Sequence, residues 1–73
     1  MLGRTILTDV TGMVTVSDWG DAEITEDELA SAIQFFKMNW KVANFISLTV
    51  KGETVVWNPQ NVVSVKIETD KND

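Results

Sequence analysis

Residues 45–68 read FISLTVKGETVVWNPQNVVSVKIE and carry the clearest structural signal in the chain. Three runs rich in β-branched and aromatic residues are separated first by a Lys-Gly pair and then by an Asn-Pro pair. Runs of this composition form strands, and Gly and Asn-Pro mark turns between them. The stretch therefore predicts a three-stranded antiparallel meander around which the rest of the chain folds.

The Lys51-Gly52 pair predicts a two-residue hairpin loop, which sets the register of the first two strands. The resulting pairs are Val50 with Glu53, Leu48 with Val55, and Ile46 with Trp57. The apolar residues of these pairs share one face, toward the helix, and the opposite face carries Phe45, Ser47, Thr49, Thr54 and Val56. Turning Val63, Val65 and Ile67 inward requires an odd-numbered connection or a bulge after Trp57, because side chains alternate along a strand.

The stretch from Ile24 to Trp40 has the pattern of a helix with a well-marked start. Thr25 is the expected N-cap, and Glu28 follows three residues later, which is the spacing of a capping box. At about 100° per residue, one apolar stripe collects the residues that should pack on the sheet. The stripe consists of Leu29, Ala32, Ile33, Phe36 and Trp40.

Phe35 and Met38 fall on the far side of the same helix. An exposed aromatic beside a Met favours a contact surface. The alternative is that loop residues such as Trp19 cover them. Trp19 follows Asp18 in a turn, and it either folds back over the edge of the core or is offered to a partner, since Trp is enriched at interface hot spots.

The N-terminal residues contain two short β-rich runs, Arg4 to Val10 and Met13 to Ser17. A hairpin with Thr11-Gly12 at its tip would place Leu7 opposite Val16; a single bent strand is the alternative. We therefore predict an α+β fold in the order ββαβββ, with one helix on one face of an antiparallel sheet of four to five strands. Residues 1–73 form a single domain with a disordered tail at about 70–73.

The net charge is −5, and the acidic residues are concentrated in the front half of the chain. The acidic face consists of Asp18, Asp21, Glu23, Glu26 and Asp27. An acidic balance argues against direct nucleic-acid binding and against binding to anionic membranes. Three interpretations of this face stay open: a solvated helix start, a site for a hard cation such as Ca²⁺, and a mimic of a phosphate backbone.

Catalytic chemistry is poorly supported, because the chain has no His, Cys or Tyr. It therefore lacks the commonest general base, any thiol nucleophile and the usual nitrogen and sulfur metal ligands. No phosphate-binding glycine motif occurs, and no signal peptide or apolar run of about 20 residues is present. We expect a non-enzymatic, cytoplasmic protein without cofactor, metal or membrane partner.

Part of the predicted meander resembles a known family. Leu48-Thr49, Gly52, Trp57-Asn58-Pro59, Val62, Val65 and Glu68 resemble the hairpin of the small flagellar proteins called FlbD, and similar hairpins occur in other small bacterial and phage proteins. The resemblance covers about a third of the chain, residues 45–68, and lacks the family's Asn before Gly. The resemblance implies a bacterial or bacteriophage origin. It assigns no functional residue, because every matching residue has a turn or packing role.

The function that we expect is that of a small protein-interaction module that self-associates. Its candidate contact residues are Trp19, Phe35, Met38, Phe45 and Val56. The alternative is an acidic inhibitor that binds a basic, nucleic-acid-binding protein through the acidic face.

Overall fold

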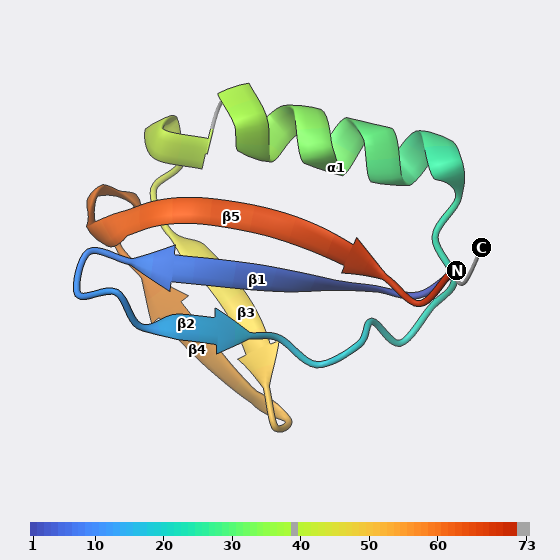
Figure 1. The fold of residues 1–73 in the computed structure, drawn as a ribbon, viewed down its shortest axis with the longest axis horizontal. Coiled ribbons are helices and arrows are strands. Elements are labelled where there is room, and N and C mark those ends of the chain that lie inside the picture. The colour runs from blue at the N-terminus through green and yellow to red at the C-terminus, as the bar shows by residue number, and fades with distance from the viewer. Residues whose placement is uncertain (39, 72–73) are drawn as a thin grey trace.

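The computed structural model describes residues 1–38 and 40–71, and of Met38 only the backbone. The elements are β1 (Gly3–Asp9), β2 (Val14–Val16), α1 (Glu26–Met38), β3 (Ile46–Val50), β4 (Glu53–Trp57) and β5 (Val62–Thr69), with 3₁₀ turns at Trp40–Val42 and Pro59–Asn61. Figure 1 shows α1 alongside β5, with the β3–β4 hairpin crossing behind the other strands. The α+β class and the order ββαβββ are as predicted.

The prediction of a single sheet is wrong, because the strands form two sheets. One has the order β2-β1-β5 and the other consists of β3 and β4, and every pairing is antiparallel. The cause is the turn after β4, where Asn58 Oδ1 accepts a hydrogen bond from the Gln60 amide at 3.0 Å and starts a 3₁₀ turn. The amide of Val10 then donates to the Asn61 carbonyl at 2.9 Å, so β5 continues beside β1 instead of beside β4.

The register of the β3–β4 hairpin is confirmed. Ile46 lies opposite Trp57 and Leu48 opposite Val55. Lys51 and Gly52 have φ angles of 51° and 79°, which is the pattern of a type I′ turn. Such a turn matches the twist of the two strands and closes the hairpin with two residues.

The β1–β2 hairpin is present, but its predicted register is wrong by one residue. Leu7 lies opposite Thr15, because the loop has three residues and not two. The Asp9 amide donates to the Met13 carbonyl at 3.0 Å, and the Asp9 carboxylate accepts from the Thr11 amide at 2.9 Å. Gly12, with φ of 88°, takes the left-handed position that three-residue hairpin loops require.

A bulge in β5 decides which valine is buried. Thr8 pairs with Ser64 and Asp9 with Val62, so Val63 is the extra residue between them. Val62 is 1% exposed, whereas Val63 is 59% exposed. The prediction that Val63 turns inward is therefore wrong, although a bulge does correct the parity of the strand.

The core lies between the inner faces of the two sheets. Its buried hydrophobic residues are Leu7, Ile46, Leu48 and Val62, and partly buried Trp40, Val50, Trp57 and Val65 pack against them. This set comes from β1, β3, β4, β5 and the 3₁₀ turn after α1. The helix itself adds no fully buried side chain among the described residues, so the core is small for the number of apolar residues in the chain.

The start of α1 is confirmed at Thr25, whose hydroxyl accepts the Glu28 amide at 3.1 Å. The helix ends earlier than predicted, and Trp40 lies in the following 3₁₀ turn, where it packs on the core. Within the apolar stripe Leu29, Ala32 and Phe36 are partly buried, but Ile33 is 44% exposed. The helix therefore lies beside β5 and contacts it without closing over a sheet face.

Candidate interaction surface

The folded chain exposes more surface than a compact monomer of its size. Its accessible surface is 5224 Å², whereas a monomer of 8.1 kDa is expected to expose about 4,500 Å². The radius of gyration is 12.1 Å, against about 11 Å expected for this length. The fold is therefore less compact than an average monomer of this length.

Much of this surface is apolar. The exposed large hydrophobic residues are Val10, Met13, Val14, Val16, Trp19, Ile33, Phe35, Val42, Phe45, Val55, Val56 and Val63. Single exposed hydrophobic residues are normal, but contiguous groups mark contact sites. The question is therefore which of them share a face.

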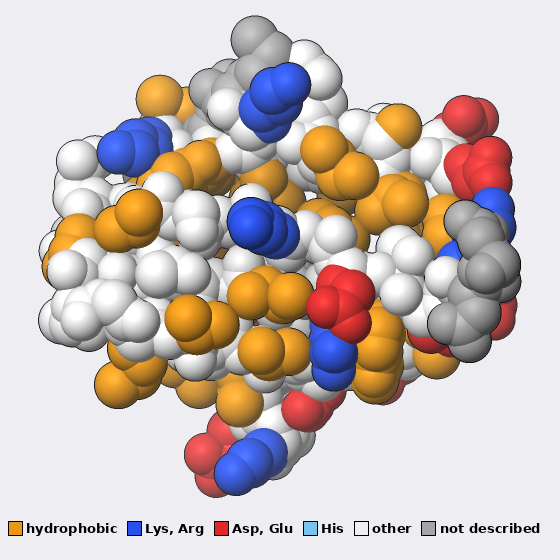
Figure 2. Space-filling view, viewed as in Figure 1, with side chains coloured by type: hydrophobic (Ala, Val, Ile, Leu, Met, Phe, Trp, Pro, Cys, Tyr) orange, Lys and Arg blue, Asp and Glu red, His pale blue; other side chains and the backbone are white. Residues whose placement is uncertain are grey.

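The outer face of the three-stranded sheet mixes apolar and charged side chains. Val14 and Val16 are 58% and 40% exposed, and by register they lie on the face of Arg4, Lys66 and Glu68. Figure 2 shows this side of the molecule, where hydrophobic side chains alternate with basic and acidic ones. The charges interrupt the apolar area.

Trp19 packs against the charged residues of this outer face. The Arg4 guanidinium lies 4.4 Å from the centre of the Trp19 ring, and Arg4 Nη2 donates to Glu68 Oε1 at 2.6 Å. The indole remains 36% exposed. Trp19 is thus engaged within the chain through a cation–π contact, with part of its ring still open to solvent.

Of the two helix residues in the predicted contact set, Phe35 is 46% exposed. Its ring meets that of Phe36 edge-on, with centroids 5.5 Å apart and planes at 70°. The side chain of Met38 lies outside the described residues. Phe35 therefore packs against Phe36 on one side and leaves part of its ring exposed on the surface of α1.

The outer face of the β3–β4 hairpin differs from the others, because its apolar residues have only small polar neighbours. We call this the hairpin face; it consists of Phe45, Ser47, Thr49, Thr54 and Val56. Phe45 and Val56 are both 59% exposed. None of these five residues is charged, so the hairpin face is less polar than the outer face of the three-stranded sheet.

The strand edges also differ in how they are protected. β2 is three residues long, and β5 has α1 beside it. At the open edge of β3, the Thr49 carbonyl is already hydrogen-bonded, because it accepts from the Asp18 amide at 2.8 Å. β4 has five residues, four of them exposed, and its sequence ETVVW contains no Lys or Pro. Short strands, covering elements, charged side chains and Pro are the devices that block edge pairing, and of these β4 has only the charged Glu53 at its start.

A hollow of about 610 Å³ lies under α1, between the helix, β1 and β3. Leu29 and Ala32 of the helix line it, together with Leu48 of β3 and Ile67 of β5. Leu48 is buried, whereas Leu29, Ala32 and Ile67 are only partly buried. The hollow shows why the described chain buries so few side chains.

Most of the predicted acidic face is used within the chain. Both Asp18 carboxylate oxygens accept backbone amides, from Lys51 and Gly52, at 2.8 Å each. Glu23 pairs with the amino group of Met1, and Glu26 Oε1 accepts from Lys71 Nζ at 3.0 Å. Asp21 and Asp27 make no hydrogen bond or ion pair with the residues that the structure describes. In the described ranges, no three acidic side chains group as metal ligands would.

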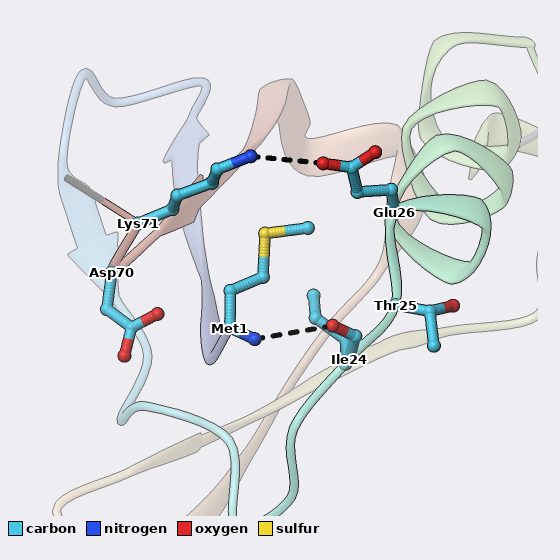
Figure 3. Close-up of a pocket in the computed structure, with 6 residues that line it drawn as sticks. All are labelled: Met1, Ile24, Thr25, Glu26, Asp70 and Lys71. Atoms are coloured by element: carbon cyan, nitrogen blue, oxygen red, sulfur yellow. Dashed lines mark hydrogen bonds and ion pairs between the residues drawn. The ribbon is translucent and has the colours of Figure 1, made fainter. Parts of the chain in front are cut away.

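The two ends of the described chain meet at the start of α1, around a hollow of about 490 Å³ (Figure 3). The Ile24 amide donates to the Met1 carbonyl at 2.7 Å, and the Asp70 amide donates to the Leu2 carbonyl at 3.0 Å. Asp70 and Lys71, which the sequence assigns to a disordered tail, thus make specific contacts, and residues 72–73 lie outside the described range. These hydrogen bonds and the Lys71–Glu26 ion pair connect the N-terminal residues, the start of α1 and the residues that follow β5.

The Asp18 contacts predict a pH dependence of stability. Hydrogen bonds from the Gly52 and Lys51 amides hold the pKa of the Asp18 carboxyl below its ordinary value of 3.8. The unfolded state therefore binds the proton first, and the contribution of Asp18 to stability is complete above pH 3.8 and is lost as the pH falls through the lowered pKa.

We expect Asp18→Asn to reduce the difference in unfolding free energy between pH 6 and pH 2.5, measured by urea titration. Asp21→Asn is the matched control and should keep that difference. An Asp18→Asn protein with the full pH dependence would contradict the hydrogen bonds described.

Comparisons with known proteins add no relative: no family model, no curated protein and no solved structure matches this chain. The similarity of residues 45–68 to the FlbD hairpin therefore remains a resemblance. Among the described residues, no helix has the length and apolar content that crossing a membrane would require.

Proposed function

We propose that the protein is a non-enzymatic interaction module that assembles with copies of itself. The observation that carries this proposal is the open apolar hairpin face, whose Phe45 and Val56 side chains are each 59% exposed. A second copy would remove this surface from water, at roughly 25 cal/mol for each Å² of apolar area.

The candidate contact residues predicted from the sequence are Trp19, Phe35, Met38, Phe45 and Val56. Phe45 and Val56 support the proposal best, because both are 59% exposed and the alternation of side chains along the hairpin assigns both to the face without charged residues. Trp19 supports it less, since its ring is already engaged by Arg4. Phe35 belongs to another element and would extend the contact only if α1 also reaches the partner.

The acidic-inhibitor alternative has less support. Asp18, Glu23 and Glu26 bond to backbone amides, the N-terminus and Lys71 respectively. A surface that imitates a phosphate backbone needs carboxylates that are free to meet basic groups. The association that we propose is instead apolar and should persist at high salt, because screening weakens only charge contacts.

The test is the dissociation constant of the assembly, measured by light scattering over a concentration series. Phe45→Glu should raise the constant at least about tenfold, because it places a charge in an apolar contact. Gln60→Glu, also at an exposed position, adds the same charge outside the hairpin face and should leave it unchanged. Equal constants for wild type and Phe45→Glu, or association abolished by 1 M salt, would contradict the proposal.

A further inference from the structure

We infer that the groove between α1 and β5 binds a small molecule that carries one anionic head group on an apolar body. The groove is separate from the hairpin face, and the inference does not depend on self-association. It starts from a contrast of charge: the protein as a whole has a net charge of −5, whereas the charged side chains described around this groove are basic.

The groove has the size of a small-molecule site. Its volume is about 480 Å³, and it lies between the second half of α1, the 3₁₀ turn that follows and β5. Ligand pockets in proteins have volumes of about 300–1,000 Å³, and most combine apolar walls with a few polar groups that fix the orientation of the ligand. The lining of this groove has that composition.

The walls of the groove are apolar. Ile33 belongs to the stripe that the sequence assigns to the sheet, yet it is 44% exposed, and it lines this groove. Val63, which the β5 bulge turns outward, is 59% exposed and also lines it. The partly buried residues of the lining are Phe36, Trp40, Val65 and Ile67. An apolar ligand body would remove these side chains from water, which is favourable in proportion to the area covered.

The polar side chains of the groove are Lys37, Lys66 and Ser64, and among the described residues no acidic side chain lines it. Neither lysine forms an ion pair within the part of the chain that the structure describes. The one glutamate of β5, Glu68, is occupied by Arg4, whose Nη2 lies 2.6 Å from Glu68 Oε1. The two groove lysines are therefore available to an anion from outside the chain.

Lys41 adds a third positive charge beside the groove. Its Nζ lies 5.2 Å from the centre of the Trp40 ring, and Trp40 is part of the lining. Figure 2 shows basic side chains among hydrophobic ones over the end of α1 and over β5, whereas acidic side chains gather at the start of the helix. The basic charges and the apolar walls thus occupy one region of the surface.

This region suits a small anion better than a nucleic acid. A nucleic-acid strand would extend past the groove, and the net negative charge of the protein would oppose it. Strand binding also uses open aromatic faces for base stacking. Trp40 instead packs on the core, and Phe36 meets the Phe35 ring edge-on. A single head group needs only the lysines, and its apolar body needs only the walls.

Decanoate, a carboxylate on an alkyl chain, is the first ligand to test. The full chain has three tryptophans, whose indole N–H signals can be followed by two-dimensional NMR. Decanoate should shift the Trp40 signal in a saturable way, and Trp40→Phe identifies that signal. The signal of Trp57, on β4, should not move. Hexanoate should bind at least about tenfold more weakly, because it buries fewer methylene groups. Decyltrimethylammonium, with the same chain length and a positive charge, should not shift the Trp40 signal.

A pair of double variants tests the role of the lysines. Lys37→Gln with Lys66→Gln should raise the dissociation constant of decanoate at least about tenfold, because charge-assisted contacts to the carboxylate are lost. Lys51→Asn with Gln60→Glu makes the same change in net charge at exposed positions outside the groove. Asn tolerates the positive φ of residue 51. This control should leave the constant unchanged, and circular dichroism should show both proteins folded.

The possible results are distinct. Saturable binding that the groove variant weakens and the control does not supports the site. Equal binding of decanoate and decyltrimethylammonium would show apolar adsorption without selection for an anion, and would overturn the inference. An unmoved Trp40 signal at millimolar decanoate would also overturn it, as would a shift caused by oligothymidine and not by decanoate. Self-association is measured separately, so none of these results decides the proposed function.

Discussion

Leu7→Ala should unfold a large fraction of the protein or lower its unfolding free energy by about 2–5 kcal/mol, the range for truncating a buried leucine. Leu7 is 0% exposed and belongs to the buried set with Ile46, Leu48 and Val62. A domain of this length has a total stability of about 4–11 kcal/mol at typical values per residue. The loss is therefore about half of the whole stability.

The measurement is urea unfolding followed by tryptophan fluorescence at one fixed protein concentration. The matched control is Val10→Ala, which truncates a side chain that is 61% exposed in the β1–β2 loop. It should change the unfolding free energy by no more than about 0.5 kcal/mol. Equal midpoints for the two variants would mean that the core is not centred on Leu7.

The second large effect is on thermal unfolding, whose midpoint should rise with protein concentration. When a folded dimer dissociates into unfolded monomers, each tenfold rise in concentration adds about 1.4 kcal/mol per dimer. For a domain of 60–100 residues, half of that per chain corresponds to a midpoint shift of about 3–6 °C. The effect applies at concentrations above the dissociation constant.

Lysine substitutions at two valines of equal exposure, 59% each, turn this shift into a test of the hairpin face, because Val56 lies on that face and Val63 lies at the β5 bulge. Val56→Lys should move the concentration dependence to higher protein concentrations, and Val63→Lys should leave it unchanged. Differential scanning calorimetry over a hundredfold concentration range measures both. A wild-type midpoint that does not move over that range would show that folding and association are not linked.

Local signals in the sequence predicted local structure well. Thr25 and Glu28 placed the helix start correctly, since capping involves residues three apart. The Lys51-Gly52 pair set the β3–β4 register, because a two-residue loop leaves one alignment. Each of these features depends on only a few consecutive residues.

The errors came from contacts between distant residues and from side-chain participation in turns. The destination of β5 depends on the Asn58 cap and on the bond between Val10 and Asn61, which no periodicity in residues 62–69 reveals. The shifted β1–β2 register depends on the Asp9 carboxylate, whose acceptance of loop amides is a recognised Asx pattern. That signal was present in the sequence as Asp followed three residues later by Gly.

The candidate contact residues were identified from the sequence only in part. The observed register confirms the alternation from Ile46 to Trp57, with Ser47 opposite Val56, whereas Phe45 precedes β3 and lies outside the paired residues. The open edge of β4 could not be seen from the sequence, because a meander would have paired it with β5. The acidic residues were grouped by proximity in sequence, whereas Asp18 turns toward the β3–β4 loop and Glu26 toward Lys71.

Sedimentation equilibrium of the unmodified protein tests the central claim most directly. The chain has a mass of 8.1 kDa, and self-association through one two-fold contact predicts a weight-average mass that rises with concentration toward twice that value. The rise should persist in high salt. A mass that remains at 8.1 kDa up to millimolar concentration would contradict the account.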